Sequence, residues 1–177
     1  MHRLFAAIRP PRAIRAQLLG LMEGVRAARW QSDAQLHITL RFIGEVETPL
    51  AEDIAIALGG VRGAAFGVAL DGIGSFESGG RRGSLWAGVR PHDSLKALHR
   101  KIDSALRRCG VPPEHRAYLP HITLARLNRS SGPIDDFARV HAALTSTPFA
   151  VADFCLYESF LTGEGARYEI VERYSLR

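Results

Sequence analysis

Cysteine is scarce in this chain of 177 residues, which contains two. Cys109 and Cys155 stand far apart, and neither belongs to a CxxC pair. We therefore expect free thiols in a reducing compartment rather than a framework of disulfides.

Long apolar runs are also missing. Near the N-terminus, residues 4–8 (LFAAI) are followed at once by arginine and two prolines, so the run is too short for the apolar core of a signal peptide. No stretch approaches the roughly 20 residues that cross a bilayer. The sequence predicts a soluble, cytoplasmic protein with no membrane partner.

No linker rich in proline, glycine or serine divides the chain, whose length fits one domain or two small lobes with a shared core. Apolar residues make up 46% and charged residues 23%, as in ordinary globular proteins. Lysine and arginine total 23 against 18 acidic residues, a formal net charge of +5. This excess is compatible with a polyanion such as RNA without demonstrating one.

One tetrapeptide, HITL, occurs twice, at residues 37–40 and 121–124. In an extended strand alternate residues point to the same side, so Ile and Leu enter a core while His and Thr project together from the other face. If the fold brings both copies together, two imidazoles and two hydroxyls surround one small space. The candidate site residues are then His37, Thr39, His121 and Thr123.

The two tetrapeptides belong to a longer repeat. Residues 4–10 (LFAAIRP) align with residues 85–91 (LWAGVRP), and further matches follow in the same order. This order, kept over about 80 residues, predicts two β-α-β-α-β units related by a pseudo-twofold axis. We expect a single domain over residues 1–177, made of two lobes with repeats at about 3–80 and 84–164 and a final strand at 167–175.

The expected strands are half-polar rather than continuously apolar, which favours antiparallel pairing in an α+β fold. The simplest arrangement is two mainly antiparallel sheets that form a central cleft, with helices outside. The helices are expected at about 11–27, 49–58, 93–108 and 133–144. Residues 79–83 (GGRRG) predict a turn, either a plain surface hairpin or a mobile basic loop near bound RNA.

Each histidine alone is most simply a surface or core residue, but the return of His and Thr together in a diverged repeat favours a functional pair. A metal site is a rival, because histidine is the commonest ligand. Two ligands are too few for zinc, however, and no HxH, HExxH or carboxylate cluster accompanies them. Nucleophilic hydrolysis would need a Ser or Cys beside a base, and neither cysteine lies near a motif.

General acid–base catalysis is the remaining chemistry. One imidazole can accept a proton while the other, charged, donates one. The threonine hydroxyls can donate hydrogen bonds to the non-bridging oxygens of a phosphate between them. Such a set can cleave a phosphodiester in line without a metal, and its symmetry leaves open which histidine is the acid.

Four motifs carry a resemblance to a known family: RWxxxxxLHITLRFIGEV (29–46), SLWAGV (84–89), PHITLAR (120–126) and LYES (156–159). The chain resembles the bacterial and archaeal RNA 2',3'-cyclic phosphodiesterases of the 2H phosphoesterase superfamily, formerly called 2'-5' RNA ligases. The resemblance implies hydrolysis of a 2',3'-cyclic phosphate RNA end to a 2'-phosphomonoester, with no metal or cofactor. It also implies that His37 is the proton donor to the departing 3' oxygen and that His121 is the proton acceptor that activates water.

Five residues after each histidine the repeat has diverged, to Phe42 and Arg126. An arginine can pair with phosphate and an aromatic ring can stack on a base, and the resemblance implies that both positions contact the nucleotide. Simple alternation puts an offset of five on the opposite face, so the strand must bulge or end first. The alternatives are a core role for Phe42 and a plain surface charge for Arg126. Arg41 is expected to be solvated or to steer RNA.

Three functions stay open. The leading one is hydrolysis of RNA ends, tRNA fragments among them, or of cyclic nucleotides. The second is 2'-5' RNA ligation, the same chemistry reversed, and the third is an RNA-end-binding module without turnover. An internal twofold axis removes one reason to dimerise, so a monomer is expected. The other histidines have no repeat partner and are expected to be exposed or structural: His2, His92, His99, His115 and His141. Among them His115 is an outside candidate for the site, because it lies just before the second motif.

Overall fold

The computed structural model describes residues 1–78 and 81–177. The first half of the chain forms β1 (His2–Ile8), α1 (Arg12–Leu19), β2 (Arg29–Trp30), the 3₁₀ helix η1 (Asp33–Gln35), β3 (Ile38–Val46), α2 (Thr48–Leu58) and β4 (Phe66–Ser78). The second half forms β5 (Arg81–Arg90), α3 (Asp93–Arg108), β6 (His121–Arg126), α4 (Asp135–Val140), β7 (Phe149–Val151), β8 (Asp153–Thr162) and β9 (Gly165–Ser175).

On either side of the centre of the sheet, corresponding strands of the two sequence repeats follow in the same order. The strand order is β7-β4-β5-β6-β3-β1-β8-β9, and the neighbouring strands pair antiparallel. The order β6-β5-β4 on one side matches β3-β1-β8 on the other, strand for strand in the two sequence repeats. At the centre Ile38 pairs with Ile122, the same residue of the two tetrapeptides. The predicted α+β fold of duplicated, pseudo-twofold units is confirmed.

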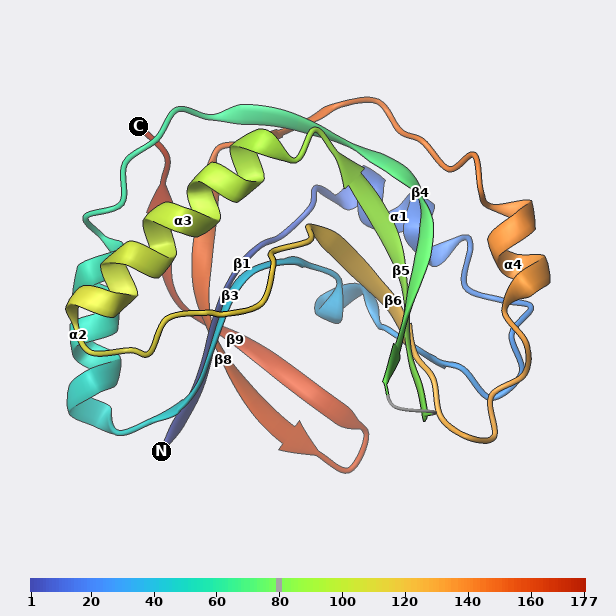
Figure 1. Cartoon of the computed structure of the whole chain (residues 1–177), viewed down its shortest axis with the longest axis horizontal. Coiled ribbons are helices and arrows are strands. Elements are labelled where there is room, and N and C mark those ends of the chain that lie inside the picture. The colour runs from blue at the N-terminus through green and yellow to red at the C-terminus, as the bar shows by residue number, and fades with distance from the viewer. Residues whose placement is uncertain (79–80) are drawn as a thin grey trace.

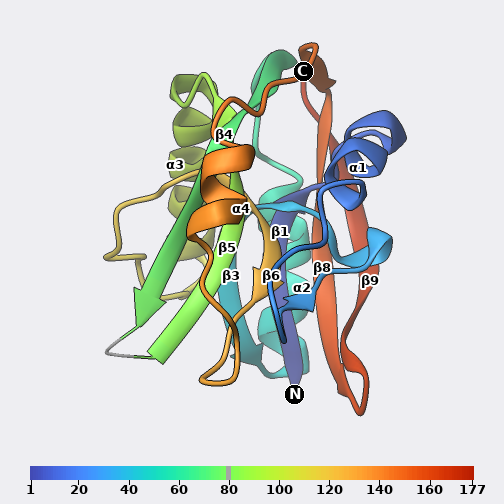
Figure 2. The ribbon, with the colours of Figure 1, turned by 90° about the vertical axis from the view of Figure 1, so that its right-hand side faces the viewer.

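The two expected sheets join at this central pair into one curled antiparallel sheet (Figure 1). β7 pairs with β4 at one end of the strand order and, after Ala152, the chain continues as β8 beside β1. Figure 2 shows the strands side by side, with β4 and β5 towards one edge and β8 and β9 towards the other. The central strands β3 and β6 therefore stand in the middle of the curl.

The buried face of the central strands is apolar, as alternation predicts. Ile38, Leu40, Ile122 and Leu124 are at most 1% exposed and belong to one core cluster. α3 buries its apolar stripe against α2 and β3, although β3 belongs to the other half of the sequence. The halves therefore interleave, and the polar face of β3 and β6 is left free for a site.

Two helices are shorter than predicted. α1 ends at Leu19 rather than near 27, and the φ angles of 84° at Gly24 and 54° at Ala27 show that the chain beyond it is not helical. Val25 still packs in the core, which explains its helical spacing in the sequence. α4 covers six residues, Asp135–Val140, instead of 133–144.

Of the expected turn at 79–83, Gly79 and Gly80 lie outside the described residues, and residues 81–83 belong to strand β5. Within the ranges that are described, no helix has both the length and the apolarity needed to cross a membrane.

Candidate active site

The two tetrapeptides meet crosswise on the polar face of β3 and β6. Continuing the antiparallel register of Ile38 and Ile122 by one residue in each direction sets His37 opposite Thr123 and His121 opposite Thr39. Because Ile and Leu are buried, these four polar residues project from the opposite side. The fold thus brings together the two histidines and two threonines that the repeat singled out.

Each histidine is held in the same way by a backbone carbonyl two residues earlier. His37 Nδ1 lies 2.7 Å from the oxygen of Gln35, and His121 Nδ1 lies 2.7 Å from the oxygen of Leu119. A carbonyl only accepts hydrogen bonds, so Nδ1 donates in both rings. Nε2 is therefore the atom that takes up or releases a proton in each imidazole.

Aromatic rings enclose both imidazoles. The ring of His37 packs against Phe5, at a centroid distance of 5.0 Å, and edge-on against Tyr168 at 5.4 Å. His121 packs against Trp86 at 5.6 Å and against Phe76 at 5.0 Å. Phe5 and Trp86 are counterparts in the aligned repeats, so the two enclosures are related by the pseudo-twofold axis.

Burial disfavours the charged form of both histidines. It lowers the pKa of His37 to about 4, and the positive charges of Arg126 and His121 act in the same direction, against the hydrogen bond to Gln35. Burial also lowers the pKa of His121, with a further contribution from Arg126. Both rings are therefore neutral at pH 7 in the free protein, and each can be recharged by an anion placed beside it.

Matching bulges interrupt the two histidine strands. On β3, Leu40 is the extra residue, because its neighbours Thr39 and Arg41 face consecutive residues of β1. On β6 the extra residue is Leu124, for the same reason with respect to β5. A bulge inserts one residue without advancing the alternation, so residues five positions after each histidine return to its face.

This geometry decides between the two interpretations of Phe42. The side chain is 48% exposed, so the core role is wrong, and its ring lies 5.7 Å from the guanidinium carbon of Arg3. Arg126 is exposed on the same face of the sheet. The expectation for Arg41 is also wrong: it is 6% exposed and pairs with Asp103 at 2.8 Å, because the bulge turns it into the core.

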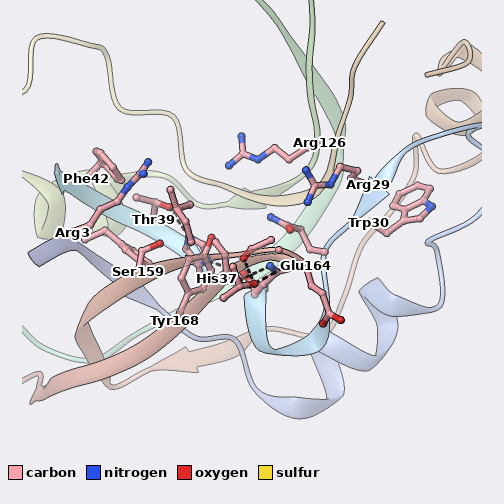
Figure 3. Close-up of a pocket in the computed structure, with 18 residues that line it drawn as sticks. Arg3, Arg29, Trp30, His37, Thr39, Phe42, Arg126, Ser159, Glu164 and Tyr168 are labelled. Carbon is pink, nitrogen blue, oxygen red and sulfur yellow. Dashed lines mark hydrogen bonds between the residues drawn. The ribbon is translucent and has the colours of Figure 1, made fainter. Parts of the chain in front are cut away.

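A cavity of about 730 Å³ opens beside His37 (Figure 3). Among the predicted site residues, it is lined by His37, Thr39, Phe42 and Arg126. His121 and Thr123 are not among its described lining residues; they lie on β6, across the central Ile38–Ile122 pair. Within the described residues, this cavity therefore lies on the His37 side of the histidine pair.

No group of three or more His, Cys, Asp or Glu side chains in the described ranges is placed to hold a metal ion.

The sequence profile of the 2'-5' RNA ligase superfamily matches residues 10–159. The chain belongs to this superfamily. It is 28% identical to an RNA 2',3'-cyclic phosphodiesterase of Archaeoglobus fulgidus, over 94% of this chain and 96% of that protein. It is 31% identical to one of Thermus thermophilus, over 99% of this chain and 90% of that protein.

The fold of this 2'-5' RNA ligase superfamily member is similar to that of solved structures. The crystal structure of Escherichia coli LigT complexed with 3'-AMP superposes with a TM-score of 0.78 at 28% identity, covering 99% of this chain and 98% of that one. That relative, which has the same fold, was crystallised in complex with a nucleotide, 3'-AMP.

Several cavity residues of this superfamily member were not singled out as site residues. Three of them could have been found from the sequence, because Arg29 and Trp30 begin the motif at 29–46 and Ser159 ends the motif at 156–159. Arg3 and Tyr168 could not have been found in this way, since they lie outside every motif and only the sheet brings them beside His37.

Proposed function

We propose that the chain hydrolyses RNA 2',3'-cyclic phosphate ends to 2'-phosphomonoesters by metal-independent acid–base catalysis. The observation that carries this proposal is the crosswise meeting of the two tetrapeptides, with both Nδ1 atoms bound to carbonyls, so that Nε2 is the atom of each ring that can exchange a proton. The curated relatives, which are RNA 2',3'-cyclic phosphodiesterases, support the reaction class.

In the proposed reaction His121 Nε2 accepts a proton from water as the water oxygen attacks phosphorus. The bond from phosphorus to the 3' oxygen breaks opposite the new bond, and His37 Nε2 gives its proton to that oxygen. The bond to the 2' oxygen stays intact, so the product is a 2'-phosphomonoester. The proton count balances, because the base gains the proton that the acid loses.

The position of the cavity supports His37 as the acid. The 3' oxygen remains on the substrate's own ribose after cleavage, so the acid must face the nucleoside. The base, by contrast, needs to reach only a water molecule. The cavity of about 730 Å³ lies beside His37, which gives the nucleoside its place there.

The low pKa of His37 requires that the substrate itself helps to charge the acid. Burial is the main cause of that low pKa, and the positive charge of Arg126 adds to it. A cyclic phosphate carries a negative charge, which offsets this repulsion and favours the protonated imidazole. Binding and protonation of His37 are therefore coupled in the proposed mechanism.

The remaining residues bind the substrate in this scheme. Thr39 Oγ1, which lies 2.9 Å from His37 Nε2, and the equivalent hydroxyl of Thr123 donate hydrogen bonds to non-bridging phosphate oxygens. Arg126 neutralises the phosphate, and Phe42 stacks on the base. The nucleotide bound by the E. coli relative supports this use of the cleft.

The proposal extends to the setting of the enzyme. We infer one domain over residues 1–177, acting as a monomer in the cytoplasm, with neither metal nor cofactor. Cys109 and Cys155 are free thiols, which supports a reducing compartment. Ligation by the reverse reaction, and RNA-end binding without turnover, are the alternatives that the experiment separates.

The decisive experiment incubates an oligonucleotide ending in a 2',3'-cyclic phosphate with the protein in EDTA. We expect a 2'-phosphate end, and a loss of roughly 10²–10⁴ in rate for His37→Ala and for His121→Ala. His115→Ala is the matched control, because His115 is exposed outside the cavity. Loss of activity in EDTA, or turnover that survives both substitutions, rejects the mechanism, and a 3'-phosphate product rejects the assigned roles.

A further inference from the structure

Arg29 and Arg126 lie directly opposite each other on the antiparallel strands β2 and β6. Both are exposed and both line the cavity beside His37. Like charges that face each other across a strand pair destabilise a sheet. This pair therefore has a cost that a bound anion between the two guanidinium groups would remove.

Neither arginine forms an ion pair within the part of the chain that the structure describes. Arg9 and Arg15, which do not line the cavity, both pair with Asp33, and Arg3, the other arginine of the lining, lies against the ring of Phe42. Two neighbouring guanidinium groups in a cavity, without carboxylate partners, are suited to a phosphate, which each can bind with two parallel hydrogen bonds.

Arg29 lies beside the turn between β8 and β9. Gly165 has a φ of 116°, and a Cβ added there would lie 3.4 Å from Nη2 of Arg29, so the guanidinium lies close to the turn. Gln35 contacts the same segment, because its side-chain amide donates a hydrogen bond to the backbone oxygen of Ala166 at 2.8 Å. Gln35 also supplies the carbonyl that orients His37, which links this arginine to the proposed catalytic centre.

The cavity extends in two directions from His37. Figure 3 shows Phe42 and Arg3 on one side of His37 and Arg29 and Trp30 on the other. With the terminal base stacked on Phe42 and the cyclic phosphate at His37, the Arg29 side has no part of a mononucleotide to bind. In an RNA chain, the 5' oxygen of the terminal ribose leads to the preceding phosphodiester, which fits this side.

We propose that Arg29, together with Arg126, binds the phosphodiester that precedes the terminal nucleotide, an inference that rests on the proposed function. The substrate is then an RNA chain with a cyclic phosphate end rather than a free cyclic mononucleotide. Arg126 contacts both phosphates, and Arg29 contacts the preceding one.

The test compares two substrates, 2',3'-cyclic AMP and the adenosine dinucleotide that ends in a 2',3'-cyclic phosphate. We expect the wild type to show at least about tenfold higher kcat/KM on the dinucleotide, since charge-assisted contacts to one added phosphate favour it. In Arg29→Gln this ratio should fall about tenfold, mainly through KM, and the salt dependence on the dinucleotide should weaken. Arg107→Gln, an exposed arginine outside the cavity, is the matched control.

The outcomes separate this inference from the proposed function. Equal kcat/KM of the wild type on both substrates, or equal losses on both in Arg29→Gln, overturns the second phosphate site while leaving the hydrolysis intact. If the wild type turns over neither substrate, the proposed function itself fails. A selectivity ratio that falls only in Arg29→Gln, and not in Arg107→Gln, establishes the site.

Discussion

The carbonyl oxygens of Leu40 and Leu124, the two bulge residues, each accept a hydrogen bond from outside their strand pair. The oxygen of Leu40 lies 2.6 Å from Nδ1 of His99, and that of Leu124 accepts the backbone N–H of Gln31 at 2.8 Å. The bulge at Leu40 is therefore stabilised by a side chain, and the bulge at Leu124 is stabilised by a backbone N–H group. In the first case His99 also stacks on Tyr118, with a centroid distance of 4.4 Å.

This relationship predicts that His99 and Tyr118 position the proposed catalytic strand. The hydroxyl of Tyr118 donates to the oxygen of Thr39 at 2.8 Å, so the stacked pair fixes the bulge that aims Thr39 and Phe42. Tyr118→Phe keeps the stack and should cost about 1 kcal/mol of stability and severalfold in kcat. His99→Leu should lower both stability and kcat more than His99→Asn does, because asparagine retains a hydrogen-bond donor near the position of Nδ1.

Urea unfolding measures stability and steady-state kinetics on the cyclic phosphate measures kcat for these variants. A merely structural role would lower stability without changing kcat of the folded enzyme, and would not distinguish His99→Asn from His99→Leu in kcat. That result would contradict the prediction.

The low pKa values of the histidines predict an acidic optimum for kcat/KM. One limb of the bell-shaped profile should lie near the His37 value of about 4, and the other below the ordinary histidine value of 6.5, where His121 titrates. The kcat profile should move to higher pH, because the bound anion raises both pKa values. A kcat/KM that stays constant from pH 5 to 8 would show that these groups do not control the reaction.

Stability should also depend on the protonation of His37. Its pKa is about 4 in the folded protein and 6.5 in the unfolded chain, so between these values the unfolded state binds more protons and stability falls as pH falls. From pH 7 to pH 5 this amounts to roughly 2 kcal/mol. His37→Asn should be spared that loss, while His115→Asn, at an exposed position, should behave as the wild type in urea unfolding at both pH values.

The sequence predicted the central features because the repeat encodes them directly. The tetrapeptide fixes which residues face the core, and its duplication fixes the symmetry about Ile38 and Ile122. The bulge was required by the offset of Phe42, although its position at Leu40 was not predicted. Arg41 was misjudged for that reason, since only the bulge turns its guanidinium towards Asp103.

What the sequence did not reveal depends on long-range packing. Arg3 and Tyr168 approach His37 only because β1 and β9 flank β8 in the sheet, and no local pattern indicates that order. The asymmetry of the cavity is likewise a property of the folded chain. An exact repeat of His and Thr is consistent with either histidine as the acid, whereas the cavity distinguishes the two sides.

Phe42 offers a sharp test of base recognition, because the chain contains a similar pair elsewhere. Its ring lies 5.7 Å from the guanidinium carbon of Arg3 at the cavity, and that of Phe160 lies 5.0 Å from Arg167 outside it. Base stacking on an aromatic ring is worth about 1–3 kcal/mol, so Phe42→Ala should raise KM roughly 5- to 150-fold with a smaller change in kcat.

Phe160→Ala removes the same kind of cation–π pair from β8 and serves as the control. It should leave KM within about twofold of the wild type, because neither Phe160 nor Arg167 lines the cavity. Kinetics on a cyclic phosphate substrate with a base, compared with the cyclic phosphate of ribose alone, isolates the stacking contribution. If Phe42→Ala loses as much on the ribose substrate as on the nucleotide, the ring supports the cleft rather than the base.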